Sequence, residues 1–95
     1  MQPVINTQCG SEFTVHLDEV PSSGYVWQAR EPGEGVALID QGYANEAPEG
    51  IGATRRKYFR FRAGERPGEL TLHFELKRPW ENAALREETV SVSVE

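Results

Sequence analysis

The chain has 95 residues, with ten Lys and Arg against fifteen Asp and Glu, and a formal net charge of −5. Its length fits one small domain, residues 1–95, with a single hydrophobic core. The acidic balance argues against a general nucleic-acid binder, and no stretch approaches the roughly 20 apolar residues that cross a bilayer.

Only one cysteine is present, Cys9, so an internal disulfide is excluded and the fold must be held by packing. No basic segment followed by an apolar one opens the chain, so no secretory leader is visible. We therefore expect a cytoplasmic protein as the sequence stands, and a periplasmic or secreted one if a leader has been removed. We expect no metal and no cofactor, because no closely spaced set of ligands occurs.

The first half of the chain alternates apolar and polar residues over short runs, as half-buried strands do. Phe13, Val15 and Leu17 point one way between polar neighbours. Trp27 lies on the same face of its run as Tyr25, and we expect it in the core. The strands predicted in this half span 4–5, 13–17, 25–30 and 36–41.

The second half begins with a polar segment, 42–52, which has neither a strand nor a helix period and is predicted as a long loop. Phe59 and Phe61 then face one way in a strand whose other face is basic. One helical turn is expected at 81–87, although it is too short to be stable alone. The strands predicted in this half span 54–62, 70–77 and 90–95.

Seven short strands with turn signals between them predict an all-β protein, an immunoglobulin-like antiparallel β-sandwich of about seven strands. If successive strands alternate in direction, the second-to-third, fourth-to-fifth and sixth-to-seventh connections emerge at the same end. These connections are 21–24, 42–53 and 78–85. Loops grouped on a rigid sandwich are a common way to build a binding edge.

Three stretches in these connections resemble the binding loops of the chagasin family, the protein inhibitors of papain-like cysteine proteases. The family has a Pro-Thr-Thr-Gly-aromatic loop, a Gly-rich loop and an Arg-Pro-Trp loop, in this order. The order and rough spacing match here, from about residue 4 to residue 94. The matching residues are Pro21, Ser22, Ser23, Gly24 and Tyr25, then Gly50, Ile51, Gly52, Ala53 and Thr54, then Arg78, Pro79 and Trp80.

The resemblance implies that the protein binds a papain-like cysteine protease reversibly and blocks its cleft, with no covalent chemistry of its own. It implies that 21–25 enters the cleft near the catalytic cysteine. It also places 50–54 on the non-primed side of the cleft and 78–80 on the primed side. We expect no enzyme activity, no nucleic-acid partner, no membrane insertion, and a monomer when the protein is free.

The sequence departs from the family pattern in three places. Val20 replaces the asparagine before the proline, which removes a polar side chain that braces the turn. The Gly-rich loop has fewer glycines than usual, and Glu81, Asn82 and Ala83 replace the glycine that commonly follows the Arg-Pro-Trp loop. These departures bear on the potency and the preferred protease more than on the fold.

Trp80 follows Pro79 in a loop, where a large aromatic ring is hard to bury, and tryptophan is enriched at binding hot spots. We therefore predict that Trp80 and Ser23 are hot spots of the binding edge. The competing interpretation is that Trp80 folds back as a lid over the end of the core.

Enzymatic and nucleic-acid functions fit the sequence less well. Cys9 with His16 or His73 would be a nucleophile and its base, but Cys9 lies in a turn and both histidines occupy polar positions of the alternation. The run of five basic residues at 55–62 would be a nucleic-acid patch, but strand alternation predicts a solvated strand face instead.

The main alternative function is an immunoglobulin-like adhesion or protein-interaction module that inhibits no protease. Such a module would use a sheet face or an edge strand rather than one end of the sandwich. Exposure of Trp80 and of 22–23 at one end is the feature that separates the two hypotheses.

Overall fold

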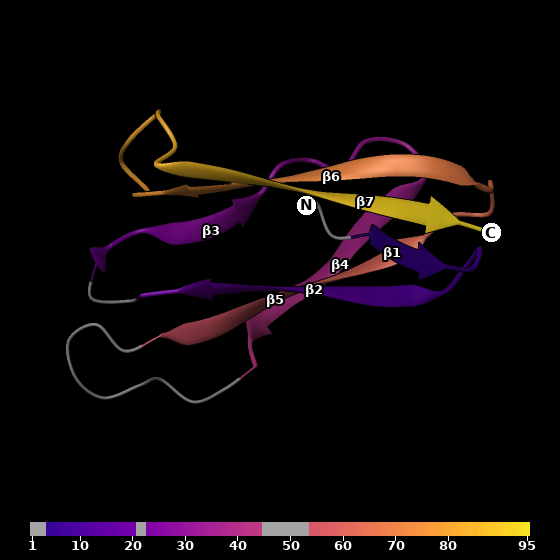
Figure 1. The fold of residues 1–95 in the computed structure, drawn as a ribbon, viewed down its shortest axis with the longest axis horizontal. Coiled ribbons are helices and arrows are strands. Elements are labelled where there is room, and N and C mark those ends of the chain that lie inside the picture. Colours follow the sequence, from indigo (N-terminus) through magenta and orange to yellow (C-terminus); the bar gives the residue numbers. More distant parts are fainter. Residues whose placement is uncertain (1–3, 21–22, 45–53) are drawn as a thin grey trace.

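The alternation of apolar and polar residues produces seven strands in the described part of the chain, packed as two sheets. The computed structural model describes residues 4–20, 23–44 and 54–95. The strands are β1 (Val4–Thr7), β2 (Glu12–Glu19), β3 (Val26–Ala29), β4 (Val36–Tyr43), β5 (Arg55–Ala63), β6 (Gly68–Lys77) and β7 (Arg86–Val94). One sheet has the order β1-β7-β6-β3 and the other the order β2-β5-β4 (Figure 1).

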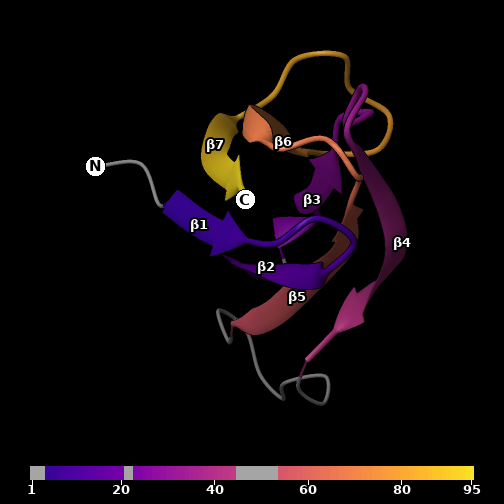
Figure 2. The ribbon, with the colours of Figure 1, turned by 90° about the vertical axis from the view of Figure 1, so that its right-hand side faces the viewer.

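The two sheets face each other across one core, as the end view in Figure 2 shows. Phe59, Phe61 and Phe74 are fully buried between them, with ring centroids 5.1 Å apart for Phe59 and Phe74 and 6.2 Å apart for Phe61 and Phe74. Trp27 is only 2 % exposed, as its position in the alternation predicts. The arrangement confirms the predicted immunoglobulin-like β-sandwich of seven strands.

One strand pair departs from the predicted antiparallel arrangement. β1 runs parallel to β7, with Val4 opposite Ser91 and Thr7 opposite Val94. The other strand pairs of the described residues are antiparallel. The first and seventh strands point the same way in a chain whose strands alternate in direction, so they are parallel when they become neighbours.

The fourth strand is longer than the sequence predicts. It continues to Tyr43, so Gly42 and Tyr43 belong to a strand and not to the loop predicted at 42–52. Gly42 lies opposite Tyr58, and a Cβ atom on Gly42 would come within 3.0 Å of the Tyr58 hydroxyl. The glycine that resembles a loop signal is therefore a strand position that another side chain approaches closely.

The helical turn expected at 81–87 is absent. Residues 82, 83 and 85 form bends, and Arg86 already lies opposite Leu76 in the pairing of β7 with β6. Strand pairing outweighs the weak helical preference of so short a segment. No helix among the described residues is long and apolar enough to cross a membrane.

Alternating strand directions bring three connections to one end of the sandwich (Figure 1). At this end β2 stops and β3 starts, β4 stops and β5 starts, and β6 turns into β7. The connections from β1 to β2, from β3 to β4 and from β5 to β6 belong to the other end. The chain directions that the sequence predicts are therefore confirmed.

Candidate protein-binding edge

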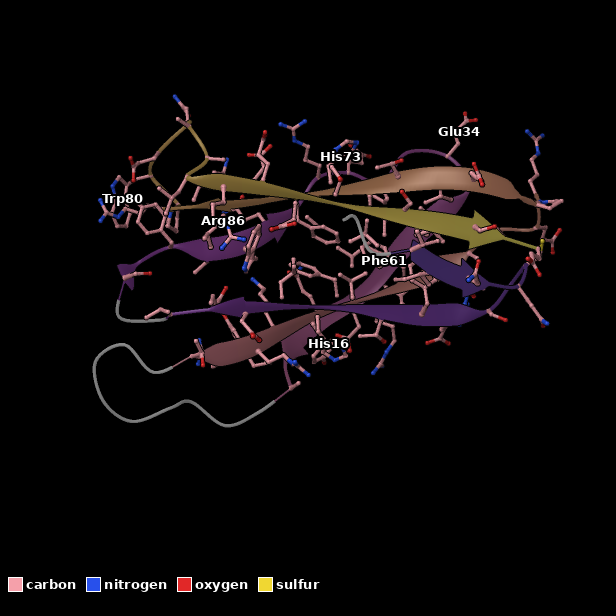
Figure 3. All side chains as sticks on the ribbon, in the orientation of Figure 1. His16, Glu34, Phe61, His73, Trp80 and Arg86 are labelled. Atoms are coloured by element: carbon pink, nitrogen blue, oxygen red, sulfur yellow. The ribbon has the colours of Figure 1, made fainter. Side chains whose placement is uncertain are left out.

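The loop between β6 and β7 presents a tryptophan to solvent. Trp80 is 74 % exposed and lies at the end of the sandwich (Figure 3). Glu81 N donates a hydrogen bond to Arg78 O at 3.0 Å, and Leu85 N donates to Leu76 O at 2.8 Å, which closes the loop at its base. Because the ring is exposed, the interpretation of Trp80 as a lid over the core is wrong.

A serine hydroxyl closes the turn between β2 and β3. Ser23 Oγ donates to Val20 O at 2.6 Å, and Ser23 N donates to the same oxygen at 3.0 Å. Ser23 Oγ also accepts a hydrogen bond from Tyr25 N at 3.2 Å. Gly24 lies between them with φ of 80°, a left-handed conformation that favours glycine. Ser23 thus supplies a brace that the Val20 side chain cannot.

The turn and the β6–β7 loop contact each other. The Arg78 guanidinium carbon lies 4.6 Å from the centroid of the Tyr25 ring, a cation–π geometry. A Cβ atom on Gly24 would lie 3.8 Å from Arg78 Nε and 3.9 Å from the Trp80 ring carbon Cη2. Residues 23–25 and 78–80 therefore form one continuous surface, which we call the binding edge.

Two of the three predicted stretches, 21–25 and 50–54, lie only partly within the described residues. Pro21 and Ser22 lie outside them, as do Gly50, Ile51, Gly52 and Ala53, so the roles predicted for these residues stay predictions. Thr54 is exposed directly before β5. Ala44 N donates to Arg56 O at 2.8 Å, which ties the chain after β4 to β5.

Sequence reasoning missed a polar cluster around a buried carboxylate next to the binding edge. It is formed by Glu19, Trp27, Tyr43, Arg55 and Lys57, and we call it the Glu19 cluster. The Glu19 side chain is 2 % exposed and accepts hydrogen bonds from Trp27 N at 3.0 Å and from the Tyr43 hydroxyl at 2.7 Å. Lys57 Nζ donates to Trp27 O at 2.8 Å. The Arg55 guanidinium lies 3.5 Å from the centroid of the Tyr43 ring.

Partial burial shifts two pKa values in the Glu19 cluster. It raises the pKa of the Tyr43 phenol, and the hydrogen bond to Glu19 raises it further. It lowers the pKa of the Lys57 ammonium, because the charged form is desolvated. One signal in the sequence could have revealed the buried carboxylate, although not its partners: Glu19 falls on the same inward-facing positions as Phe13 and Val15, where a carboxylate is unexpected.

The outer face of β5 is basic, as predicted, and its charges are compensated. Phe59 and Phe61 point into the core from the opposite face. Three arginines of β5 lie close to carboxylates: Arg56 at 3.5 Å from Asp18, Arg60 at 3.7 Å from Asp40, and Arg62 at 3.0 Å from Glu12. These pairs give the face the character of a solvated strand surface.

The cysteine and the histidines occupy structural positions. Cys9 lies in the turn between β1 and β2 and packs against the core. His16 and His73 are exposed and project outward from opposite sheets (Figure 3). Within residues 4–20, 23–44 and 54–95, no group of three or more His, Cys, Asp or Glu side chains is placed to hold a metal ion.

Comparison with known proteins places this chain among protease inhibitors. The family model described as chagasin family peptidase inhibitor matches residues 6–94. A search of proteins with curated function finds no matching sequence. Among solved structures, the cysteine protease inhibitor EhICP2 from Entamoeba histolytica is similar, with a TM-score of 0.77 and 21 % identity over 99 % of this chain and 87 % of that one.

Two further solved structures share the fold. The solution structure of Amebosin has a TM-score of 0.72 and 25 % identity, over 97 % of this chain and 88 % of that one. PbICP-C, solved in complex with falcipain-2, has a TM-score of 0.67 and 15 % identity, over 100 % of this chain and 90 % of that one.

Proposed function

The chain belongs to the chagasin family of peptidase inhibitors, and from this membership we propose that it inhibits papain-like cysteine proteases by placing its binding edge in the active-site cleft. Inhibition is reversible: the edge fills the cleft and excludes substrate, and no bond forms between inhibitor and enzyme. The inhibitor needs no catalytic group for this action.

The partner class follows from the family and agrees with the printed descriptions of the similar structures. One of them is a cysteine protease inhibitor, and another was solved in complex with falcipain-2. We extend this class of partner to the present chain. The net charge of −5 and the compensated basic strand are compatible with a protein partner.

The contact between the exposed Trp80 loop and the 23–25 turn is the single observation that carries the proposal. Ser23 and Gly24 have little side-chain bulk, so their backbone can enter a narrow cleft. The hydrogen bonds of Ser23 hold this turn in one conformation before binding, which reduces the entropy lost on association. In this proposal Trp80, Pro79 and Arg78 pack on the primed side of the cleft.

The sequence-based prediction also assigns protease contacts to Pro21, Ser22 and the 50–54 stretch. We retain these as part of the proposal on the ground of the family resemblance. The alternative of an adhesion module is less favoured, because the exposed Trp80 lies at one end and not on a sheet face or an edge strand.

The test is a titration of papain activity with the purified protein, with trypsin as the serine-protease control. We expect stoichiometric, reversible loss of papain activity and no effect on trypsin. Trp80→Ala should raise the dissociation constant roughly thirtyfold, equivalent to about 2 kcal/mol, because truncation of a hot-spot tryptophan removes a large apolar contact. Its circular dichroism spectrum should match that of the parent, since the ring contributes little to the core.

Two outcomes would contradict the proposal. Undiminished papain activity at micromolar inhibitor would contradict the proposed inhibition of papain-like proteases. Equal inhibition by Trp80→Ala and the parent would contradict the hot-spot role of Trp80, but not the inhibitory function of the protein.

A further inference from the structure

Glu19 is a carboxylate in the protein interior. It is 2 % exposed, whereas glutamate is almost never fully buried unless partners satisfy it. It is the last residue of β2, directly before the turn that carries Ser23 and Gly24. Its partners therefore show what the residue is used for.

The two carboxylate oxygens of Glu19 bind different strands. Oε2 accepts from Trp27 N of β3 at 3.0 Å, and Oε1 accepts from the Tyr43 hydroxyl at the end of β4 at 2.7 Å. β3 belongs to one sheet, and β2 and β4 belong to the other. Glu19 therefore ties the two sheets together at the end of the sandwich that carries the binding edge.

Other bonds of the Glu19 cluster strengthen the same junction. Trp27 Nε1 donates to Asp18 O at 2.8 Å, so the tryptophan is bonded to two successive residues of β2. Lys57 Nζ of β5 donates to Trp27 O at 2.8 Å. Trp27, near the start of β3, is thus held by hydrogen bonds of its backbone N–H, its backbone carbonyl and its indole N–H.

The junction continues into the binding edge through short stretches of chain. Trp27 follows Tyr25 by two residues, and the Tyr25 ring lies under the Arg78 guanidinium. Tyr43 and Arg55, which stack at 3.5 Å, end β4 and begin β5. The strand ends at this end of the sandwich therefore carry residues that are bonded to Glu19 or to one of its partners. The β6–β7 loop contacts Tyr25, two residues before Trp27.

We infer that Glu19 is a positioning residue of the inhibitor: its carboxylate fixes the ends of β2, β3 and β4 relative to one another, so that the binding edge is preorganised before it meets the protease. This inference rests on the proposed function. A buried carboxylate with these partners is not needed for the sandwich itself, because apolar contacts of similar volume stabilise a core as well or better. Its placement at the bases of the loops gives it the positioning role.

The experiment compares Glu19→Ala, Glu19→Gln and Tyr43→Phe with a control, Val94→Ala. Val94 is 3 % exposed and ends β7 at the opposite end of the sandwich, so its truncation lowers stability without touching the junction. Each variant is measured for papain inhibition, for urea unfolding, and for amide hydrogen exchange at Tyr25 and Glu81. These two amides donate the hydrogen bonds that close the turn and the β6–β7 loop.

We expect Glu19→Ala to raise the inhibition constant about tenfold, the cost of ordering one or two extra side chains on binding, and to speed exchange at both amides. Glu19→Gln should recover most of the inhibition, because an amide accepts from Trp27 N and donates to the Tyr43 oxygen. Tyr43→Phe removes one of the two bonds and should give an intermediate loss. Val94→Ala should inhibit like the parent wherever it is folded.

The inference is overturned if Glu19→Ala and Tyr43→Phe inhibit no worse than Val94→Ala at matched stability. If Glu19→Ala does not fold, Tyr43→Phe decides the question by the same comparison. A failure of the proposed function looks different, because the parent protein itself would then leave papain active. The exchange rates at Tyr25 and Glu81 would still report whether Glu19 orders the loops.

Discussion

Single side chains at the binding edge have roles that their residue types alone do not predict. Val20 has no polar side chain to brace the turn, and the Ser23 hydroxyl provides the brace by donating to Val20 O at 2.6 Å and accepting from Tyr25 N. A serine differs from threonine here by one methyl group, and the hydroxyl is the part that makes these bonds. The hydrogen bonds of Ser23, the positive φ of Gly24 and the amide of Tyr25 therefore define the turn locally.

The Tyr43 phenol makes the stability of the protein depend on pH in the alkaline range. Its pKa in the folded state lies above the ordinary value of 10.0, because burial and the hydrogen bond to Glu19 disfavour the phenolate. The native state therefore keeps this proton when the unfolded chain loses it. The stabilisation is complete below pH 10 and is lost as the pH rises through the folded-state pKa.

Urea unfolding between roughly pH 8 and pH 11, the range in which a tyrosine titrates, measures this effect. The parent should lose more stability than Tyr43→Phe across that range, since the variant has no proton to release at this site. The pKa of Lys57 is lowered and acts in the opposite direction, but Lys57 is present in both proteins and its contribution largely cancels. Parallel pH profiles for the two proteins would contradict the assignment.

At the scale of the strands, alternation was a reliable guide wherever one face is apolar. β2, β5 and β6 were predicted from the spacing of residues such as Phe13, Phe59 and Phe74, and all three of these residues are buried. The alternation failed in β4, where a bulge between Leu38 and Asp40 shifts the register, because a bulge inverts the pattern of faces midway along the strand.

The sequence predicts one part of the candidate site, the Trp80 loop, and does not predict the other part, the Glu19 cluster. The exposed Trp80 loop follows directly from a tryptophan placed after a proline in a connection. The Glu19 cluster does not, because its members are distributed over β2, β3, β4 and β5 and meet only through tertiary pairing. No local pattern in the sequence links Glu19 to Tyr43, so only the assembled sandwich reveals the contact.

Among the described residues of the β2–β3 turn, Gly24 alone has a positive φ, a conformation that tolerates substitution poorly. Gly24→Ala should destabilise the protein by about 1–2 kcal/mol, because an L-residue is strained at positive φ, and should weaken inhibition as the turn relaxes. A clash does not contribute, since an added Cβ would lie 3.8 Å from its nearest neighbour atom, an ordinary contact. Thermal unfolding and papain titration measure the two effects.

Gly33→Ala is the matched control for this substitution. Gly33 has φ of 72° in the β3–β4 connection at the opposite end, and its added Cβ would meet nothing within 4 Å. It should lose similar stability and keep full inhibition. Weaker inhibition by both variants to the same degree would show that global stability, and not the shape of the turn, controls binding.

For the whole molecule, the pairing of the first strand with the last bears on the folding rate. β1 lies beside β7, so Thr7 pairs with Val94 from the other end of the chain. β-sandwiches built from such distant pairings lose much loop-closure entropy before the contacts compensate, and they fold slowly for their size.

Refolding should therefore take milliseconds to seconds, the range typical of all-β domains with non-local pairing. Trp80→Ala is a convenient background, because Trp27 is then the single tryptophan and reports on the buried core. Stopped-flow dilution from urea, followed by Trp27 fluorescence, measures the rate. Complete folding within microseconds would contradict the importance of the end-to-end pairing.

The same pairing fixes the C-terminus of the chain relative to the binding edge, and so fixes the orientation of a protein tethered at its C-terminus. Glu95 N donates to Thr7 O at 2.9 Å. The C-terminus lies at the end of the sandwich opposite the β6–β7 loop (Figure 1). A tether fused after Glu95 would anchor the inhibitor to a resin with its working end facing outward, ready to capture protease from solution. In two copies joined through their C-termini, the binding edges would face in opposite directions. Such a dimer would crosslink two enzyme molecules and could not bind one enzyme molecule bivalently.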